Sequence, residues 1–174
     1  ETEISVVGIP KTIDNDIPYI DQSFGFQTAF AEATKSIRSG HVEAKASPNG
    51  VGLVRLMGRH SGFIACYASL AKPDANYVLI PEVPFALEGP NNFLDHLLNR
   101  VKQAGHAVIV VAEGAGQDLL TAKDSATDAS GNQRLGDIGF FLQDKIVGHF
   151  NDARVDLNLK SVSYTHLTLP TTEA

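Results

Sequence analysis

The sequence has little cysteine, no long apolar run and no excess of positive charge, and each shortage excludes a class of protein. A single cysteine, Cys66, cannot form an internal disulfide, which favours a reducing compartment and a place in the core for the thiol. No apolar stretch approaches the roughly 20 residues that span a bilayer. The formal net charge of −6 repels nucleic acid and anionic membranes. We therefore expect a cytoplasmic protein that binds neither nucleic acid nor membrane.

What the sequence does contain is the composition of one globular domain. The 174 residues are 43% hydrophobic and 20% charged, which suffices for a hydrophobic core. The chain begins at Glu1, directly before an apolar run, and we expect it to be an internal piece of a longer protein. The Thr-rich end resembles the translation of a sequencing-library adapter. We accordingly expect the domain to occupy residues 1–160 and a non-native tail to occupy 161–174.

Short β-branched apolar segments alternate with segments of helical spacing along the chain. The apolar runs predict strands at 4–8, 50–58, 76–82 and 106–114, with another approaching at 155–160. Helical spacing predicts helices at 24–44, 61–72, 91–105 and 135–150, and the polar segment 121–135 predicts an exposed loop. This alternation predicts an α/β fold, with a mostly parallel, Rossmann-like sheet covered by helices on both faces.

Four polar loops follow the predicted strands. They are "GIPKTIDND" (8–16), "MGRHSG" (57–62), "PEVPF" (81–85) and "EGAGQD" (113–118). In parallel sheets the functional groups gather beyond the carboxyl ends of the strands, so we expect these loops to share one rim. We assign Glu82, in the third loop, no chemistry beyond support.

The first of these loops combines a lysine, a hydroxyl group and two carboxylates. Asp and Asn in loops are turn formers first, so Asp14 and Asp16 have a purely structural alternative. Pro10 restricts the backbone and thereby aims Lys11. This set of groups suits phosphoryl transfer to an alcohol, because the reaction needs a carboxylate near the hydroxyl proton and positive charge on the transferred group.

The second and fourth loops add groups that bind oxygen-rich ligands. Gly58 permits a close backbone approach, and Arg59 offers a planar fork of donors to phosphate or sugar oxygens. A helix starting near Ser61 would add N–H groups that favour anions. Glu113 suits sugar hydroxyls, with capping of the following turn as its structural alternative. The second loop has the alternative of a plain strand-to-helix turn, and we expect His60 to be a bystander.

Five segments in order resemble the 6-phosphofructokinase family. They read "GIPKTIDNDI", "SFGFQTAFAEA", "VRLMGRHSGFIA", "IPEVPF" and "VVAEGAGQDL", and the wording is closest to the plant-type ATP-dependent branch. The resemblance covers residues 4 to about 160. It implies an incomplete phosphofructokinase fold and phosphoryl transfer from ATP to the 1-hydroxyl of fructose 6-phosphate, giving fructose 1,6-bisphosphate.

The resemblance also implies roles for individual residues. Asp14 would be the base facing the 1-hydroxyl, and Lys11 would neutralise charge on the transferred group. Asp16 would lie near the Mg²⁺ that accompanies ATP, whose main ligand is expected outside this chain, so no metal ligand is assigned here. Substrate binding would involve Thr12, Ile13, Asp14, Met57, Gly58, Arg59 and Glu113.

Two alternatives remain open at this point. Lys11 is shared by plant-type ATP enzymes and pyrophosphate-dependent members, and the glycine-rich segment that tells the donors apart lies upstream of this chain. A non-catalytic regulatory paralogue is the second alternative, although the presence of Asp14, Arg59 and Glu113 argues against it. We expect the chain to be inactive alone, because it lacks the donor-binding segment, and the whole protein to be a homo-oligomer.

Overall fold

The computed structural model describes residues 3–90, 92–120 and 135–163, and these form an α/β layered fold. Four parallel strands make its main sheet in the order β4-β5-β3-β6. Their bounds are Gly50–Leu56 (β3), Tyr77–Leu79 (β4), His106–Ala112 (β5) and Asn158–Ser163 (β6). Two short strands, β1 (Lys11–Thr12) and β2 (Phe24–Gly25), pair separately and in parallel. The predicted parallel sheet is therefore confirmed.

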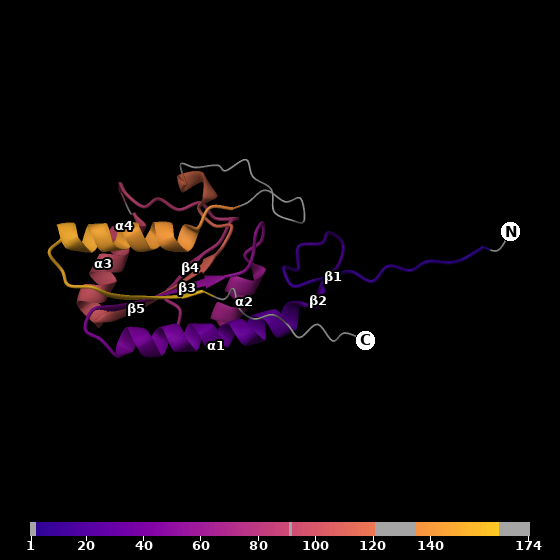
Figure 1. Cartoon of the computed structure of the whole chain (residues 1–174), viewed down its shortest axis with the longest axis horizontal. Coiled ribbons are helices and arrows are strands. Elements are labelled where there is room, and N and C mark those ends of the chain that lie inside the picture. Colours follow the sequence, from indigo (N-terminus) through magenta and orange to yellow (C-terminus); the bar gives the residue numbers. More distant parts are fainter. Residues whose placement is uncertain (1–2, 91, 121–134, 164–174) are drawn as a thin grey trace.

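Helices cover both faces of the sheet (Figure 1). Helices α1 (Phe26–Lys45) and α2 (Phe63–Ala71) pack on one face, and α3 (Phe93–Ala104) and α4 (Ile138–Asp152) on the other. A short 3₁₀ helix, η1 (Gln117–Leu119), follows β5.

The central strands serve two cores because their side chains alternate between the faces. On β3, Val51 and Leu53 enter the core under α3 and α4, whereas Val54 and Leu56 enter the core under α1 and α2. Strand β5 alternates in the same way. Burial on both faces explains why these two strands read as nearly continuous apolar runs in the sequence.

The ends of α3 follow signals that are visible in the sequence. Asn92 precedes the helix, and its side chain accepts a hydrogen bond from the Asp95 N–H at 2.7 Å. Gly105 ends the helix with a φ of 75°, a conformation that glycine adopts without strain. The helix predicted at 91–105 is therefore confirmed, and Asn92 and Gly105 mark its two ends.

Helix α1 lies unusually close to β3. A Cβ added to Gly52 would lie 2.4 Å from the Gly40 carbonyl oxygen, and one added to Gly40 would lie 2.7 Å from a Val54 methyl group. The two glycines thus let backbone approach backbone, which fixes the long helix against the centre of the sheet.

The strand predicted at 4–8 does not form. Its side chains are largely exposed, for example 80% at Ile4 and 88% at Val6, and the segment runs away from the sheet (Figure 1). A strand needs a neighbour for its N–H and C=O groups. Within the described ranges no strand lies beside this segment, so its apolar pattern alone does not suffice.

The far end of the chain also differs from expectation. Strand β6 continues through Ser163 and pairs with β3 as far as Arg55, so three residues assigned above to a tail belong to the sheet. Residues 164–174, and the loop predicted at 121–135 except for its last residue, lie outside the described part. A native end near residue 160 therefore stays a prediction.

Two further sequence expectations concern α2 and membranes. Cys66, on α2, is a free thiol that is half-buried rather than part of the closed core, and this burial raises its pKa. Among the described residues, none of the helices is both long and apolar enough to cross a bilayer.

Candidate functional site

The loop that begins at β1 is held in shape by Ser23 and Asn15. The buried Ser23 hydroxyl donates to the Thr12 carbonyl at 2.6 Å, and the Ser23 N–H donates to the Asn15 side-chain oxygen at 2.7 Å. Asn15 has a φ of 56°, in the left-handed region that Asn tolerates better than most residues. The middle residue of "DND" thus forms the turn, and the side chains of the two aspartates are not needed for it.

Asp14 is anchored through its backbone rather than its side chain. Its N–H donates to the Thr12 hydroxyl at 3.2 Å, and its carbonyl accepts a hydrogen bond from the Ser61 hydroxyl at 2.9 Å. The carboxylate atom Oδ1 is buried and has no hydrogen-bond partner among the described residues. A carboxylate held in this way remains available to accept a proton or a ligand hydroxyl.

The pKa of Asp14 is affected by other candidate residues of the site. Burial raises its pKa above the ordinary 3.8, and the negative charges of Asp16 and Glu113 raise it further. Arg59, and His60 in its protonated form, act in the opposite direction. Asp14, Arg59 and Glu113 are therefore close enough to interact, as the shared rim predicts. His60, expected to be a bystander, contributes to the potential at Asp14.

Arg59 and Glu113 come together because the loops after β3 and β5 interlock. The Gly114 N–H donates to the Gly58 carbonyl at 3.0 Å, and the Glu113 N–H donates to the Leu56 carbonyl at 2.9 Å. A Cβ added to Gly114 would lie 1.8 Å from the Arg59 carbonyl oxygen. Gly58 itself has a φ of 134°, so glycine is required on both sides of this contact.

Glu82, the residue assigned only a supporting role, joins this network. Its Oε1 accepts a hydrogen bond from the Gly62 N–H, at the start of α2, at 2.8 Å. The loop after β4 is thereby tied to the loop after β3. The sequence offers the carboxylate at a strand end as a signal, but not its partner.

Glu113 is steadied from the other side by Gln117. The Gln117 side-chain amide donates to the Glu113 carbonyl at 2.8 Å and to the Gly136 carbonyl at 3.1 Å, and its oxygen accepts the Gly136 N–H at 3.0 Å. This clamp connects the loop after β5 to the chain that enters α4. It was not found from the sequence.

The remaining predicted residues differ in where their side chains lie. Ile13 and Met57 are partly buried and pack against the core under α1 and α2. Thr12 is half-buried and directs its hydroxyl at the Asp14 N–H. Lys11 is exposed, and the cations that act on Asp14 are Arg59 and His60 rather than this lysine. Its predicted role, neutralising charge on the transferred group, stays a prediction.

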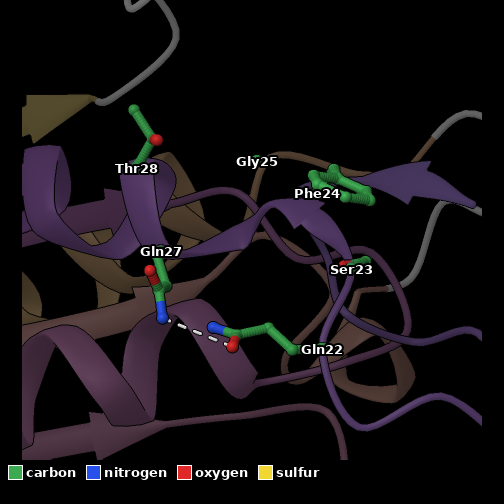
Figure 2. Close-up of a pocket in the computed structure, with 6 residues that line it drawn as sticks. All are labelled: Gln22, Ser23, Phe24, Gly25, Gln27 and Thr28. Atoms are coloured by element: carbon green, nitrogen blue, oxygen red, sulfur yellow. Dashed lines mark hydrogen bonds between the residues drawn. The ribbon is translucent and has the colours of Figure 1, made fainter.

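A hollow of about 320 Å³ opens beside this loop, at the start of α1 (Figure 2). The Gln27 side-chain amide donates to the Gln22 side-chain oxygen at 3.3 Å across it. Ser23 belongs both to the hollow and to the network that shapes the first loop. The residues that line it are Gln22, Ser23, Phe24, Gly25, Gln27 and Thr28.

The described residues do not by themselves make a metal site. No group of three or more His, Cys, Asp or Glu side chains in the described part could hold an ion. Asp14, Asp16 and Glu113 interact electrostatically but do not converge as such a ligand set.

Comparison with known proteins identifies relatives over nearly the whole chain. The family described as Phosphofructokinase matches residues 1–167. The ATP-dependent 6-phosphofructokinase of Amycolatopsis methanolica is 54% identical, in an alignment that covers 97% of this chain and 38% of the relative. ATP-dependent 6-phosphofructokinase 7 of Arabidopsis thaliana is 52% identical, covering 95% and 34%. The chain therefore spans a little over a third of the length of these relatives.

Solved structures share the fold. Phosphofructokinase from Saccharomyces cerevisiae superposes with a TM-score of 0.62 at 25% identity, covering 94% of this chain and 19% of that one. The pyrophosphate-dependent phosphofructokinase from Marinobacter aquaeolei gives a TM-score of 0.57 at 23% identity, covering 88% and 36%. The parallel sheet with helices on both faces is thus the arrangement that these proteins have.

Proposed function

We propose, because the chain belongs to the phosphofructokinase family, that the whole protein containing it transfers a phosphoryl group from ATP to the 1-hydroxyl of fructose 6-phosphate. The observation that carries the proposal is the gathering of Asp14 with Arg59 and Glu113, the latter two in the loops that follow the parallel strands β3 and β5. A base, a cation and a hydroxyl acceptor at one rim are the groups that this reaction needs.

In the proposed reaction Asp14 is the base. The oxygen of the 1-hydroxyl attacks the γ-phosphorus of ATP, the bond from that phosphorus to the bridging oxygen breaks, and ADP leaves. The hydroxyl proton passes to the Asp14 carboxylate, whose Oδ1 has no competing partner within the described part of the chain. Burial and the charge of Asp16 raise the pKa of Asp14, which makes its carboxylate a stronger base than an exposed one.

The neighbouring groups hold the reactants rather than exchange protons. The Arg59 guanidinium is planar and always charged, so it suits the oxygens of the sugar phosphate or of the transferred group. The Glu113 carboxylate suits the sugar hydroxyls. Holding the reactants in line contributes roughly 7–11 kcal/mol in well-oriented systems, so the interlocked loops matter as much as the base.

Several finer parts of the proposal concern groups outside this chain. Mg²⁺ would accompany ATP and neutralise its phosphates, with Asp16 near the ion and the main ligand outside this chain, since the described residues contain no group of three or more possible ligands. We propose that the chain alone is inactive and that the whole protein is a cytoplasmic homo-oligomer. Two Arabidopsis relatives are named chloroplastic, and that is the alternative compartment.

The donor is the least constrained part. The names of three relatives at 52–54% identity state ATP dependence, which favours ATP. Pyrophosphate is the second candidate, because pyrophosphate-dependent phosphofructokinases share the fold, although at identities too low to bear on the donor.

The test is an assay of the purified whole protein with fructose 6-phosphate and either ATP or pyrophosphate. Fructose 1,6-bisphosphate formed with ATP and Mg²⁺ is the expected result. Formation with pyrophosphate alone would replace the donor and leave the rest of the proposal standing. No product with either donor, from folded protein that binds fructose 6-phosphate, would favour a regulatory paralogue and overturn the assignment.

A further inference from the structure

Ser61 connects the loop after β3 to the loop that carries Asp14. Its hydroxyl donates to the Asp14 carbonyl at 2.9 Å, and only 4% of Ser61 is exposed. The Asp14 carboxylate atom Oδ1 has no partner of its own among the described residues. The direction of the carboxylate therefore depends on how its backbone is held, and Ser61 is one of the two groups that hold it.

The position of Ser61 is itself tightly constrained. A Cβ added to Gly58 would lie 2.4 Å from the Ser61 carbonyl oxygen, so the turn 58–61 closes on itself. At the next residue, a Cβ on Gly62 would lie 2.4 Å from an Ile80 methyl carbon. The backbone at Ser61 is thus packed between the turn 58–61 and the chain after β4, which leaves it little room to move.

Glu82 completes the link from the third loop. Its carboxylate accepts the Gly62 N–H at 2.8 Å, at the start of α2, where the helix favours negative charge. The N-cap residue of α2 is Gly62, which has no side chain to cap the helix. Glu82 supplies a carboxylate at this helix start from a neighbouring loop. The hydrogen bonds run from Glu82 through 61–62 to Asp14.

We propose that Ser61 and Glu82 are positioning residues, which set the distance of the Asp14 carboxylate from a bound sugar alcohol without touching substrate. This inference rests on the proposed function. It assigns the positioning of the base to a serine and to a carboxylate after β4. Neither of these two groups takes part in the proposed proton transfer.

The variants S61A, E82A and E82Q in the whole protein test it, with E88A as the matched control at an exposed glutamate. A small misplacement of a base costs up to about 100-fold in rate, so S61A and E82A are expected to lower kcat by roughly 10–100-fold. KM for fructose 6-phosphate should change by no more than about threefold, because ground-state binding is retained.

The conservative and double variants separate positioning from other roles. E82Q keeps an acceptor oxygen for the Gly62 N–H and is expected to recover most of the kcat lost in E82A. The double variant S61A/E82A should lose little more than either single one, because both belong to one chain of hydrogen bonds. E88A should match the unaltered protein.

Several results would overturn the inference while leaving the proposed function intact. Each of them assumes that the unaltered protein is active. The inference fails if kcat of S61A lies within twofold of the unaltered value, or if E82Q loses as much kcat as E82A. It also fails if the free-energy losses of S61A and E82A simply add in the double variant. If E82A does not fold, S61A and E82Q still decide. If the unaltered protein forms no product, the proposed function fails. Crystal structures of the unaltered and S61A proteins then decide the inference, which requires Asp14 to shift relative to Arg59 and Glu113.

Discussion

Replacing Asp14 by Asn is the sharpest perturbation that the structure offers. The substitution keeps the shape of the side chain and removes its charge and its ability to accept a proton. The backbone anchors of Asp14, to the Thr12 hydroxyl and from Ser61, are untouched. Because Oδ1 has no hydrogen bond to any described residue, the variant loses no hydrogen bond at that atom within that part of the chain.

The expected effect on catalysis is large and confined to turnover. A positioned general base contributes about 10²–10⁴ in rate, so kcat of D14N should fall by that factor, which corresponds to about 3–5 kcal/mol of transition-state stabilisation. Binding of fructose 6-phosphate should be retained within about threefold, because removal of a negative charge does not weaken the attraction of a sugar phosphate.

The same substitution should stabilise the fold at neutral pH. The pKa of Asp14 is raised in the folded protein, first by burial and then by Asp16 and Glu113. The folded state therefore binds this proton more tightly than the unfolded chain does, and stability is lost as pH rises from the ordinary 3.8 through the folded-state pKa. D14N avoids that loss, so its melting temperature should exceed that of the unaltered protein at pH 7 and approach it below pH 4.

The assays are steady-state turnover, calorimetric titration with fructose 6-phosphate, and thermal melting at two pH values. D118N is the matched control, since Asp118 is an exposed carboxylate on η1 at the same rim. A D14N protein that binds substrate and keeps kcat within tenfold of the unaltered value would refute the base. A D14N protein that is less stable at pH 7 would refute the electrostatic reasoning.

Three further outcomes are expected. Gly52→Ala should destabilise the protein by about 1–3 kcal/mol, because its Cβ would meet the Gly40 carbonyl. Gly148→Ala, in open space on α4, should be neutral or stabilise the protein by up to about 1 kcal/mol. Melting curves that reverse this order would contradict the packing of α1 on β3. Asp137→Ala should cost about 1–2 kcal/mol in chemical denaturation, since Asp137 both caps α4 and pairs with Arg55 at 2.7 Å, and a loss below about 0.3 kcal/mol would show that neither contact matters. The low-pH limb of kcat should have an apparent pKa above 3.8 that is absent in D14N, and a limb that survives in D14N belongs to another group.

The sheet and its helices could be predicted because their signals are local. The apolar runs of β3 and β5 are buried on both faces, and Asn92 and Gly105 act on the ends of α3 alone. The segment at 4–8 has the same apolar pattern and fails as a strand, since strand formation depends on a neighbour that the pattern does not report.

The part of the candidate site that follows from the order of the strands could be predicted from the sequence. The neighbouring strands β3 and β5 end at one edge of the main sheet, and this brings Arg59 and Glu113 together. Asp14 joins them from a loop outside that sheet, through the hydrogen bond from the Ser61 hydroxyl to its carbonyl. The partners that fix them were not predictable, because the bond from Gly62 to Glu82 depends on the path of two loops. The role predicted for Lys11, neutralising charge on the transferred group, stays a prediction.

The two interpretations of "DND", as a turn and as the source of a catalytic carboxylate, are compatible in this structure. Asn15 makes the turn, with a positive φ and a hydrogen bond from Ser23, and the turn in turn places Asp14 where burial and two carboxylates oppose its charge. A fold gains no stability from such a group, since the ionised state is the disfavoured one. The two cores beneath the rim bury enough apolar surface to tolerate this cost. A charge that is disfavoured by folding, yet held by backbone contacts from two loops, is the arrangement expected of a residue kept for chemistry rather than for stability.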